Sequence, residues 1–414
     1  MALVHWLFWI STFCDGAAAI IVPIYLHDLG VNVSTISMLF VIAEVFGLLA
    51  NLVSGIAANR LGYRNTMAIG FVLHLIASTG YLFLAPQMET VLLVGIISIL
   101  RAARGSGREA VKTIASASLK LQGRNYRYKF ASIQLMFGSQ EMVKGLGIGT
   151  GLAMLRYTSM PGSFLILALL SGFALILTLR KLSDHRETQV VSLNQIFAVK
   201  RNMKVLAYAR ALFYASRDVW LVAALPIYLS QSGATNIELG MLMSASYIVY
   251  GASQPIGILI IKQVWRFRTK TVKKPWRFRN SLIWLTLLAA LIPAAAAWQS
   301  DNIDRFAFLI LLAGVANGIL VTSHNHLHLK FAKKNRSSLD ISYYKTIANL
   351  GKILAMAGSG ILYDRWSMEG CLYAASGILC LSAILTLRLR KPEDPSKRFL
   401  KQDANKNSPR PQVL

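Results

Sequence analysis

The stretch Asp15-Gly-Ala-Ala-Ala-Ile-Ile-Val-Pro23-Ile-Tyr-Leu-His-Asp-Leu-Gly30 recurs in the second half of the chain as Asp218-Val-Trp-Leu-Val-Ala-Ala-Leu-Pro226-Ile-Tyr-Leu-Ser-Gln-Ser-Gly233. Each copy places an acid at the start of an apolar run, then Pro-Ile-Tyr-Leu, then a closing Gly. An internal repeat of this kind predicts two related halves. Two membrane-embedded halves in parallel order are typical of secondary transporters, whose binding site lies between the halves.

A second match follows at nearly the same spacing. Lys144 and Ser159-Met160-Pro161-Gly162 correspond to Lys352 and Ser367-Met368-Glu369-Gly370. The sequence distance between the two copies differs slightly between the first match and the second, as a few loop insertions would produce. Two ordered matches support a true repeat and predict that Lys144 and Lys352 occupy equivalent places in the two halves.

The composition favours an integral membrane protein, because 55% of the residues are hydrophobic. Apolar runs long enough to cross a bilayer are expected at 5–27, 34–58, 66–86, 89–110, 131–155, 163–180, 204–229, 237–261, 281–299, 305–329, 341–363 and 370–387. This pattern predicts an all-α fold with twelve transmembrane helices in two pseudo-symmetric six-helix halves. The predicted domains are a first bundle (1–180), a cytoplasmic linker (181–203), a second bundle (204–388) and a disordered basic tail (389–414).

The orientation follows from the 44 Lys and Arg residues. Most of them lie in segments on one side of the predicted spans: 59–65, 111–130, 180–204, 262–280, 330–340 and 388–414. Because short basic loops stay in the cytoplasm, we expect both termini to be cytoplasmic, in a bacterial inner membrane. The net charge of +26 is then explained by anionic lipids facing these loops, and no nucleic-acid partner is expected. The repeated Trp-Arg-Phe-Arg in 262–280 indicates interfacial anchoring.

Charged residues also occur inside the predicted helices, where each costs about 2.5–3.5 kcal/mol if unpaired. The cations are Arg101, Arg104, Arg108, Lys144, Arg210, Arg217, Lys345 and Lys352, and the acids are Asp15, Glu44, Glu109, Glu141 and Asp218. Local pairs are expected between Glu141 and Lys144, between Arg217 and Asp218, and between Glu109 and Arg108. Pairing every acid still leaves cations in excess.

An excess of buried cations predicts an anionic, phosphate-bearing substrate. Arg101 and Arg104 lie one turn apart, and Lys144 and Lys352 could bind a substrate from either half. The predicted substrate-binding residues are Arg101, Arg104, Lys144, Arg217, Tyr343 and Lys352. For proton coupling, the candidates are Asp15, Glu44, Asp218 and the histidines. Asp15 is the first choice, because no cation near it in its own helix would hold it ionised.

Two further motifs suggest other roles. Gly55-Ile-Ala-Ala-Asn59-Arg60-Leu-Gly62-Tyr-Arg64 spans the turn between the second and third predicted helices. Its glycines permit a tight turn and its arginines can bond helix ends, which predicts a gate. His324, His326 and His328 alternate in sequence, but no nearby Cys or carboxylate completes a zinc ligand set. We therefore expect no metal there, and interfacial or substrate-contacting histidines.

These motifs resemble the major facilitator superfamily, both in the turn motif and in Leu100-Arg101-Ala-Ala-Arg104-Gly105-Ser-Gly107. The resemblance implies a role for Arg101 in proton or substrate coupling. Asn59 stands where that family usually has an acid.

A closer resemblance is to the organoarsenical efflux permeases of arsenic-resistance operons. It rests on Cys14-Asp15-Gly16-Ala17, Ala43-Glu44-Val-Phe-Gly47 with Asn51-Leu52, Ala115–Lys120, Ser216-Arg217-Asp218-Val219-Trp220 with Leu225-Pro226, Tyr343-Tyr344, and Asn349-Leu-Gly351-Lys352. It implies export of an arsenate ester of phosphoglycerate. Lys352 replaces the Arg expected in that family.

The leading interpretation is a proton-coupled exporter of an organic oxyanion that works by alternating access. One alternative is an importer of another anionic metabolite with the same fold. The other is a membrane scaffold or sensor that recruits partners through its basic loops. An enzyme and a bound cofactor are not expected, because the sequence has no phosphate-cradling loop of the Gly-x-x-x-x-Gly-Lys type.

Overall fold

A computed structural model describes residues 2–84, 87–120, 126–184, 201–266, 276–300, 302–331 and 337–390. Three predicted segments lie mainly or partly outside these residues. They are 185–200 of the linker predicted at 181–203, 267–275 of the basic loop predicted at 262–280, and 391–414 of the tail predicted at 389–414.

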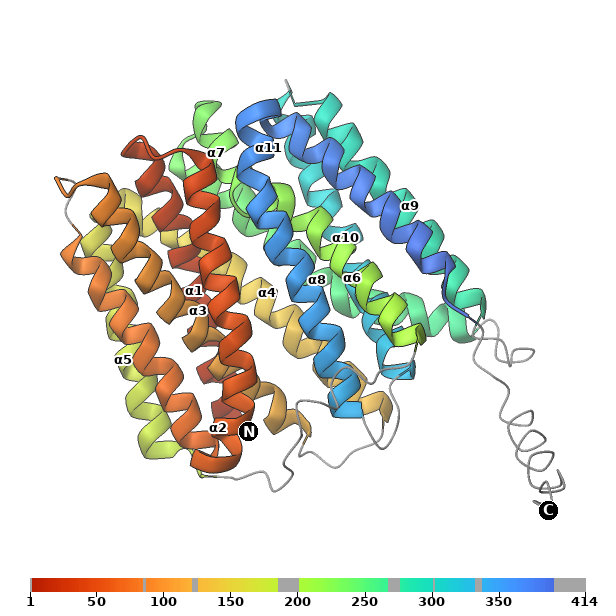
Figure 1. Cartoon of the computed structure of the whole chain (residues 1–414), viewed down its shortest axis with the longest axis horizontal. Coiled ribbons are helices and arrows are strands. Elements are labelled where there is room, and N and C mark those ends of the chain that lie inside the picture. The colour runs from red at the N-terminus through yellow and green to blue at the C-terminus, as the bar shows by residue number, and fades with distance from the viewer. Residues whose placement is uncertain are drawn as a thin grey trace, which may run out of the picture.

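The described residues form helices throughout (Figure 1). The first half contains α1 (Ala2–Asp28), α2 (Val33–Gly80), η1 (Tyr81–Phe83), α3 (Thr90–Lys120), α4 (Tyr126–Tyr157) and α5 (Met160–Lys181). The second half contains α6 (Arg201–Leu221), α7 (Ala224–Gln231), α8 (Asn236–Arg266), α9 (Trp276–Trp298), α10 (Ile303–Phe331) and α11 (Ser337–Leu387). We call the face at which α1 begins the base and the opposite face the top.

Two of the long helices are each broken once, so that each makes two crossings. Gly62 breaks α2 with φ 84°, a value that favours glycine, and a side chain there would collide with Asp184. The turn predicted around Gly62 is confirmed. Ser367, with φ 55°, breaks α11. Its sequence counterpart Ser159 caps the start of α5 by accepting a bond from the Gly162 amide, so both copies of this motif mark a helix start.

The lengths and compositions of the helices fit the membrane prediction. Nine stretches among the described residues are long and apolar enough to cross a bilayer. The last of them, Tyr343–Leu387, contains the break at Ser367 and therefore supplies two crossings. Adding α4 and α8, which carry more polar residues, makes the described helices consistent with twelve crossings.

The helix boundaries differ from the predicted ones in two places. Residues 111–130 were expected to be a basic cytosolic loop, but α3 continues to Lys120 and α4 begins at Tyr126. The basic residues of this stretch share the helix with an apolar face, whose residues Val111 and Ile114 are buried in one cluster with Phe71. The basic composition therefore predicted a loop where a helix forms. The single helix expected at 204–229 is interrupted between α6 and α7.

The two halves lie side by side in Figure 1, with α4 of the first half running beside α8 of the second. Their main contacts are between α4 and α8 and between α2 and α11. Small residues allow the first pair to approach closely: Gly138 lies against Gly251, and Gly145 lies against Ser244. At the top, the Ser34 hydroxyl of α2 donates to the Asp364 carboxylate of α11.

Within the first half, α2 and α3 pack most closely at Gly105, where an added methyl group would overlap the Ala43 carbonyl. We expect Gly105→Ala to lower the free energy of unfolding by about 1–3 kcal/mol, because overpacked helices must separate. Gly95→Ala in the same helix is the control, since nothing lies within 4 Å of its position, and alanine favours a helix by about 1 kcal/mol. Unfolding in detergent measures both effects. Equal stability of the two variants would contradict the prediction.

Candidate functional site

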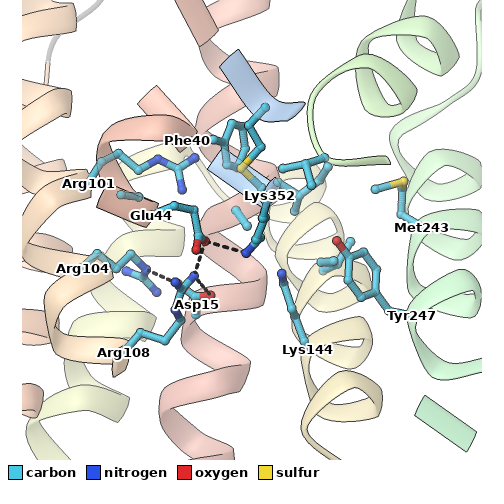
Figure 2. Close-up of a pocket in the computed structure, with 17 residues that line it drawn as sticks. Asp15, Phe40, Glu44, Arg101, Arg104, Arg108, Lys144, Met243, Tyr247 and Lys352 are labelled. Carbon is cyan, nitrogen blue, oxygen red and sulfur yellow. Dashed lines mark hydrogen bonds and ion pairs between the residues drawn. The ribbon is translucent and has the colours of Figure 1, made fainter. Parts of the chain in front are cut away.

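A cavity of about 40 Å³ lies between the halves (Figure 2). Its wall is formed by residues of α1, α2, α3, α4, α8 and α11, and by Val222, which lies between α6 and α7. The charged lining residues are Asp15, Glu44, Arg101, Arg104, Arg108, Lys144 and Lys352. The seam between the halves is where the repeat predicts a binding site.

One face of α3 supplies three of the cations. Arg101, Arg104 and Arg108 are three and four residues apart, so they project from the same side of the helix, and all three line the cavity. Gly105 lies among them and lets α2 approach. The cluster that was predicted at Arg101 and Arg104 is therefore one turn longer than expected.

Two carboxylates from other helices neutralise part of this charge. Glu44 Oε1 on α2 lies 2.9 Å from an Arg108 nitrogen and 2.8 Å from Lys352 Nζ. Asp15 on α1 lies 3.6 Å from Arg108 and 3.8 Å from Arg104 Nε. The bond between Glu44 and Lys352 connects the first half of the chain to the second, and both carboxylates lie between the cations in Figure 2.

The reason given for preferring Asp15 in proton coupling is wrong. No cation on α1 was expected to hold it ionised, but Arg104 and Arg108 reach it from α3. The sequence did not predict these contacts, because the partners are about ninety positions from Asp15 and only the packing of α3 against α1 brings them together. The preference between Asp15 and Glu44 must therefore rest on the geometry, in which Glu44 connects the two halves by an ion pair with Lys352.

Two cavity cations have no carboxylate within 4 Å among the described residues. Arg101 is 3% exposed, and its Nε and one terminal nitrogen have no hydrogen-bond partner there. Its guanidinium lies 4.5 Å from the centre of the Phe40 ring. Lys144 Nζ lies 4.9 Å from the centre of the Tyr247 ring. The expected pair between Lys144 and Glu141 is therefore not formed, because Lys144 turns toward α8.

The remaining predicted pairs and site residues lie as follows. Arg217 binds Asp218 through two bonds, of 2.7 and 3.1 Å, and Arg108 binds Glu109 at 3.2 Å. Both pairs were predicted and are confirmed. Arg217, Asp218 and Tyr343 do not line the cavity. Tyr343 is buried in the core of the second half instead.

Sequence reasoning missed several lining residues. Arg108 was assigned only to its neighbour Glu109, although its position on the helix face of Arg101 and Arg104 was a usable signal. Phe40, Met243 and Tyr247 also line the cavity, and no sequence pattern separated them from ordinary apolar residues. Tyr247 provides a hydroxyl and an aromatic face beside Lys144.

The predicted gate lies at the base, away from the cavity. Gly62 forms the turn, and Arg60 is exposed. Arg64 Nε is buried without a hydrogen-bond partner among the described residues. Gly55 has no neighbouring atom within 4 Å of an added side chain, while the Asn59 side chain falls outside the described part. A gating role for these residues stays a prediction.

No group of three His, Cys, Asp or Glu side chains that could hold a metal ion occurs in the part of the chain that the structure describes. The charged groups that line the cavity are guanidinium, ammonium and carboxylate groups. Such a set can bind and exchange anions and protons.

Comparisons with known proteins agree with this architecture. The profile of the Major Facilitator Superfamily matches residues 4–272 and 206–413. A solved structure, "Crystal structure of D-xylose-proton symporter", aligns with 94% of this chain and 98% of its own at 12% identity and a TM-score of 0.70. No curated protein matches the sequence. Because the family profile covers most of the chain, the protein is a multi-pass membrane transporter that belongs to the Major Facilitator Superfamily.

Proposed function

We propose that this transporter carries an organic oxyanion by alternating access. The observation that supports this most is the charge of the cavity, where five cations face two carboxylates. Arg101 and Lys144 have no carboxylate within 4 Å among the described residues. An uncompensated cation in a membrane interior is costly, and a phosphate or carboxylate group of a substrate would compensate it through charge-assisted hydrogen bonds.

The ion pairs suggest how protons take part. Glu44 holds both Arg108 and Lys352, so a substrate anion must compete with this carboxylate for the same two cations. Protonation of Glu44 removes its charge, which frees Lys352 and leaves Arg108 with Asp15 and Glu109 as its partners. We therefore infer that the anion and a proton bind together, and that the released Lys352 closes the second half on the substrate.

The direction that we propose is export, and the charge of the substrate supports it. A phosphoglycerate-like acid carries about two charges on its phosphate and one on its carboxylate. One accompanying proton leaves about two negative charges, and each gains about 2.3 kcal/mol when it leaves a cell interior at −100 mV. The membrane potential would therefore drive export even though the proton moves outward.

The identity of the substrate is proposed from the sequence resemblance to the organoarsenical efflux permeases. We propose an arsenylated or phosphorylated three-carbon acid as substrate, as in the organoarsenical efflux permeases, in a bacterial inner membrane with the base toward the cytoplasm. The basic segments at the base would then contact anionic lipids. Cation excess and cavity position are what support the substrate class, and the biased distribution of Lys and Arg supports the orientation.

Inside-out vesicles provide the test, because export then appears as uptake. A panel of phosphorylated and arsenylated three-carbon acids is offered with a lumen-positive potential and, separately, with an acidic lumen. Potential-driven uptake of a panel member, accompanied by lumen acidification, is the expected result. Absence of uptake for the whole panel would refute the substrate class, and uptake only under an opposite potential would favour an importer.

The scaffold or sensor alternative rests on the basic loop 262–280. Neutralising its Lys and Arg residues would then abolish function, whereas neutralising Arg101 or Lys352 would not. The reverse pattern is expected for a transporter.

A further inference from the structure

A second polar cluster lies inside the second half, away from the cavity. It consists of Arg210 on α6, His324 and His328 on α10, and Tyr344 on α11, which are all at most 6% exposed. Arg210 is nine residues from the start of α6, His328 is three from the end of α10, and Tyr344 is seven from the start of α11. The cluster therefore lies in the half of the bundle nearer the base.

These four residues leave several polar atoms unpartnered. Both ring nitrogens of His324 and Arg210 Nε have no hydrogen bond to any described residue. The Tyr344 hydroxyl lies near Arg210 and the His328 ring lies near the Asn325 backbone, but neither contact is aligned well enough to satisfy the Tyr344 hydroxyl or the His328 nitrogens. The other Arg210 nitrogens bond the Val321 carbonyl at 3.1 Å and the Tyr214 hydroxyl at 2.6 Å. No carboxylate lies within 4 Å of Arg210 among the described residues, so its charge is uncompensated. Buried polar atoms without partners are costly and point to a ligand.

Aromatic stacking fixes the orientation of the two imidazoles. The His328 ring lies 4.4 Å from the Tyr344 ring and parallel to it, with an angle of 1°. The His324 ring lies 5.6 Å from the Phe213 ring at 14°. Stacking uses the ring faces and leaves the nitrogens in the ring planes available. Arg210 lies over Tyr214, 4.3 Å from the ring centre, and within 5.9 Å of the centre of Tyr344.

The cluster lies near the seam between the halves. Two contacts between the halves lie beside it: Asn325 of α10 donates to Gln134 of α4 at 3.3 Å, and Lys345 of α11 lies over the Phe137 ring at 5.3 Å. On the other side, Tyr214 contacts Arg217 as well as Arg210, with the Arg217 guanidinium 5.1 Å from its ring centre. A rotation of the halves that parts α4 from α10 and α11 would expose the cluster at the base.

We propose that Arg210, His324, His328 and Tyr344 form a second oxyanion-binding site, at which an anion binds before it moves to the cavity. The ligand is a phosphate or phosphate-ester group, whose oxygens accept bonds from Arg210 Nε, one N–H of each imidazole and the Tyr344 hydroxyl. The class of organic ligand rests on the proposed function, but binding of a phosphate group does not. Arg217 would then be the cation between the two sites.

The test measures binding to the purified full chain by equilibrium dialysis, with radiolabelled 3-phosphoglycerate and, separately, inorganic phosphate. Arg101→Ala removes the cavity site, so one bound ligand per chain should remain. Adding His324→Phe and His328→Phe keeps the aromatic stacking and removes the nitrogens, and we expect the remaining affinity to fall at least tenfold. His27→Phe, at the top of α1, is the matched control and should change nothing.

The outcomes separate this site from the proposed function. If inorganic phosphate binds to Arg101→Ala and is lost with the two phenylalanines, the second site is established even if 3-phosphoglycerate does not bind. If Arg101→Ala binds neither ligand, or if the phenylalanines leave its affinity unchanged, the inference is wrong. If that variant does not elute as a folded protein, His324→Leu and His328→Leu replace it. Leucine also removes the ring nitrogens, and the same tenfold criterion applies to both ligands.

Discussion

Arg101→Ala is expected to abolish substrate-dependent transport and leave the folded protein intact. Arg101 lines the cavity, is almost fully buried and has no carboxylate partner in the described structure. Loss of its charge-assisted bonds to an anion should weaken binding by about 100-fold, which corresponds to about 2.8 kcal/mol. The fold should tolerate the change, because no buried carboxylate loses its partner. Uptake into inside-out vesicles and the unfolding midpoint are the two measurements.

Two further variants make the result specific. Arg101→Met keeps most of the side-chain volume and should be as inactive as Arg101→Ala, which separates charge from packing. Arg305→Ala, at an exposed position near the top, should transport normally. Normal transport by Arg101→Ala would remove the main support for an anion site. An inactive variant with a lowered unfolding midpoint would mean that Arg101 serves the fold.

Much of the fold was predictable, because apolar runs of bilayer length and one repeated motif are local signals. The break at Gly62 was also predictable, because glycine adopts the positive φ that a tight turn requires, and Gly62 has such a φ. The end of α3 was not, because its basic residues share the helix with Val111 and Ile114, whose burial depends on α2. An amphipathic helix and a basic loop can have similar compositions. The sequence distinguishes them only when the surface that buries the apolar face of the helix is known.

The site was partly predictable. The cation spacing on α3 and the excess of positive charge are properties of the sequence, and they led to Arg101, Arg104, Lys144 and Lys352, which all line the cavity. The ion pairs were not predictable, because they join α1, α2, α3 and α11. Glu44 was one of several candidate acids in the sequence, and only the packing of α2 beside α11 brings it to Lys352.

Glu44→Gln is expected to separate substrate transport from proton transport. Gln has the size of a protonated Glu and no charge, so Lys352 is free to bind the anion at every pH, while Arg108 keeps Asp15 and Glu109 as partners. In the wild type, protonation of Glu44 releases Lys352, and this should increase the anion affinity of the cavity as the pH falls. In Glu44→Gln this contribution should be lost, and the remaining pH dependence should be that of the phosphate group, whose second pKa is about 6, and of the two histidines of the second site. Equilibrium binding of 3-phosphoglycerate from pH 5 to 8, a range chosen to span about three decades of proton activity, measures this difference.

The transport assay gives an independent result for the same variant. Wild-type uptake into inside-out vesicles should carry protons into the lumen, while Glu44→Gln should accumulate the anion under a lumen-positive potential without acidification. Glu238→Gln, an exposed acid at the top of α8, is the control and should behave as the wild type. Asp15→Asn discriminates between the two carboxylates: Asp15 has no ion pair with Lys352, so its replacement should leave coupled proton movement in place. If Asp15→Asn uncouples transport and Glu44→Gln does not, the proton is carried at Asp15 and the ion pair between the halves has another role.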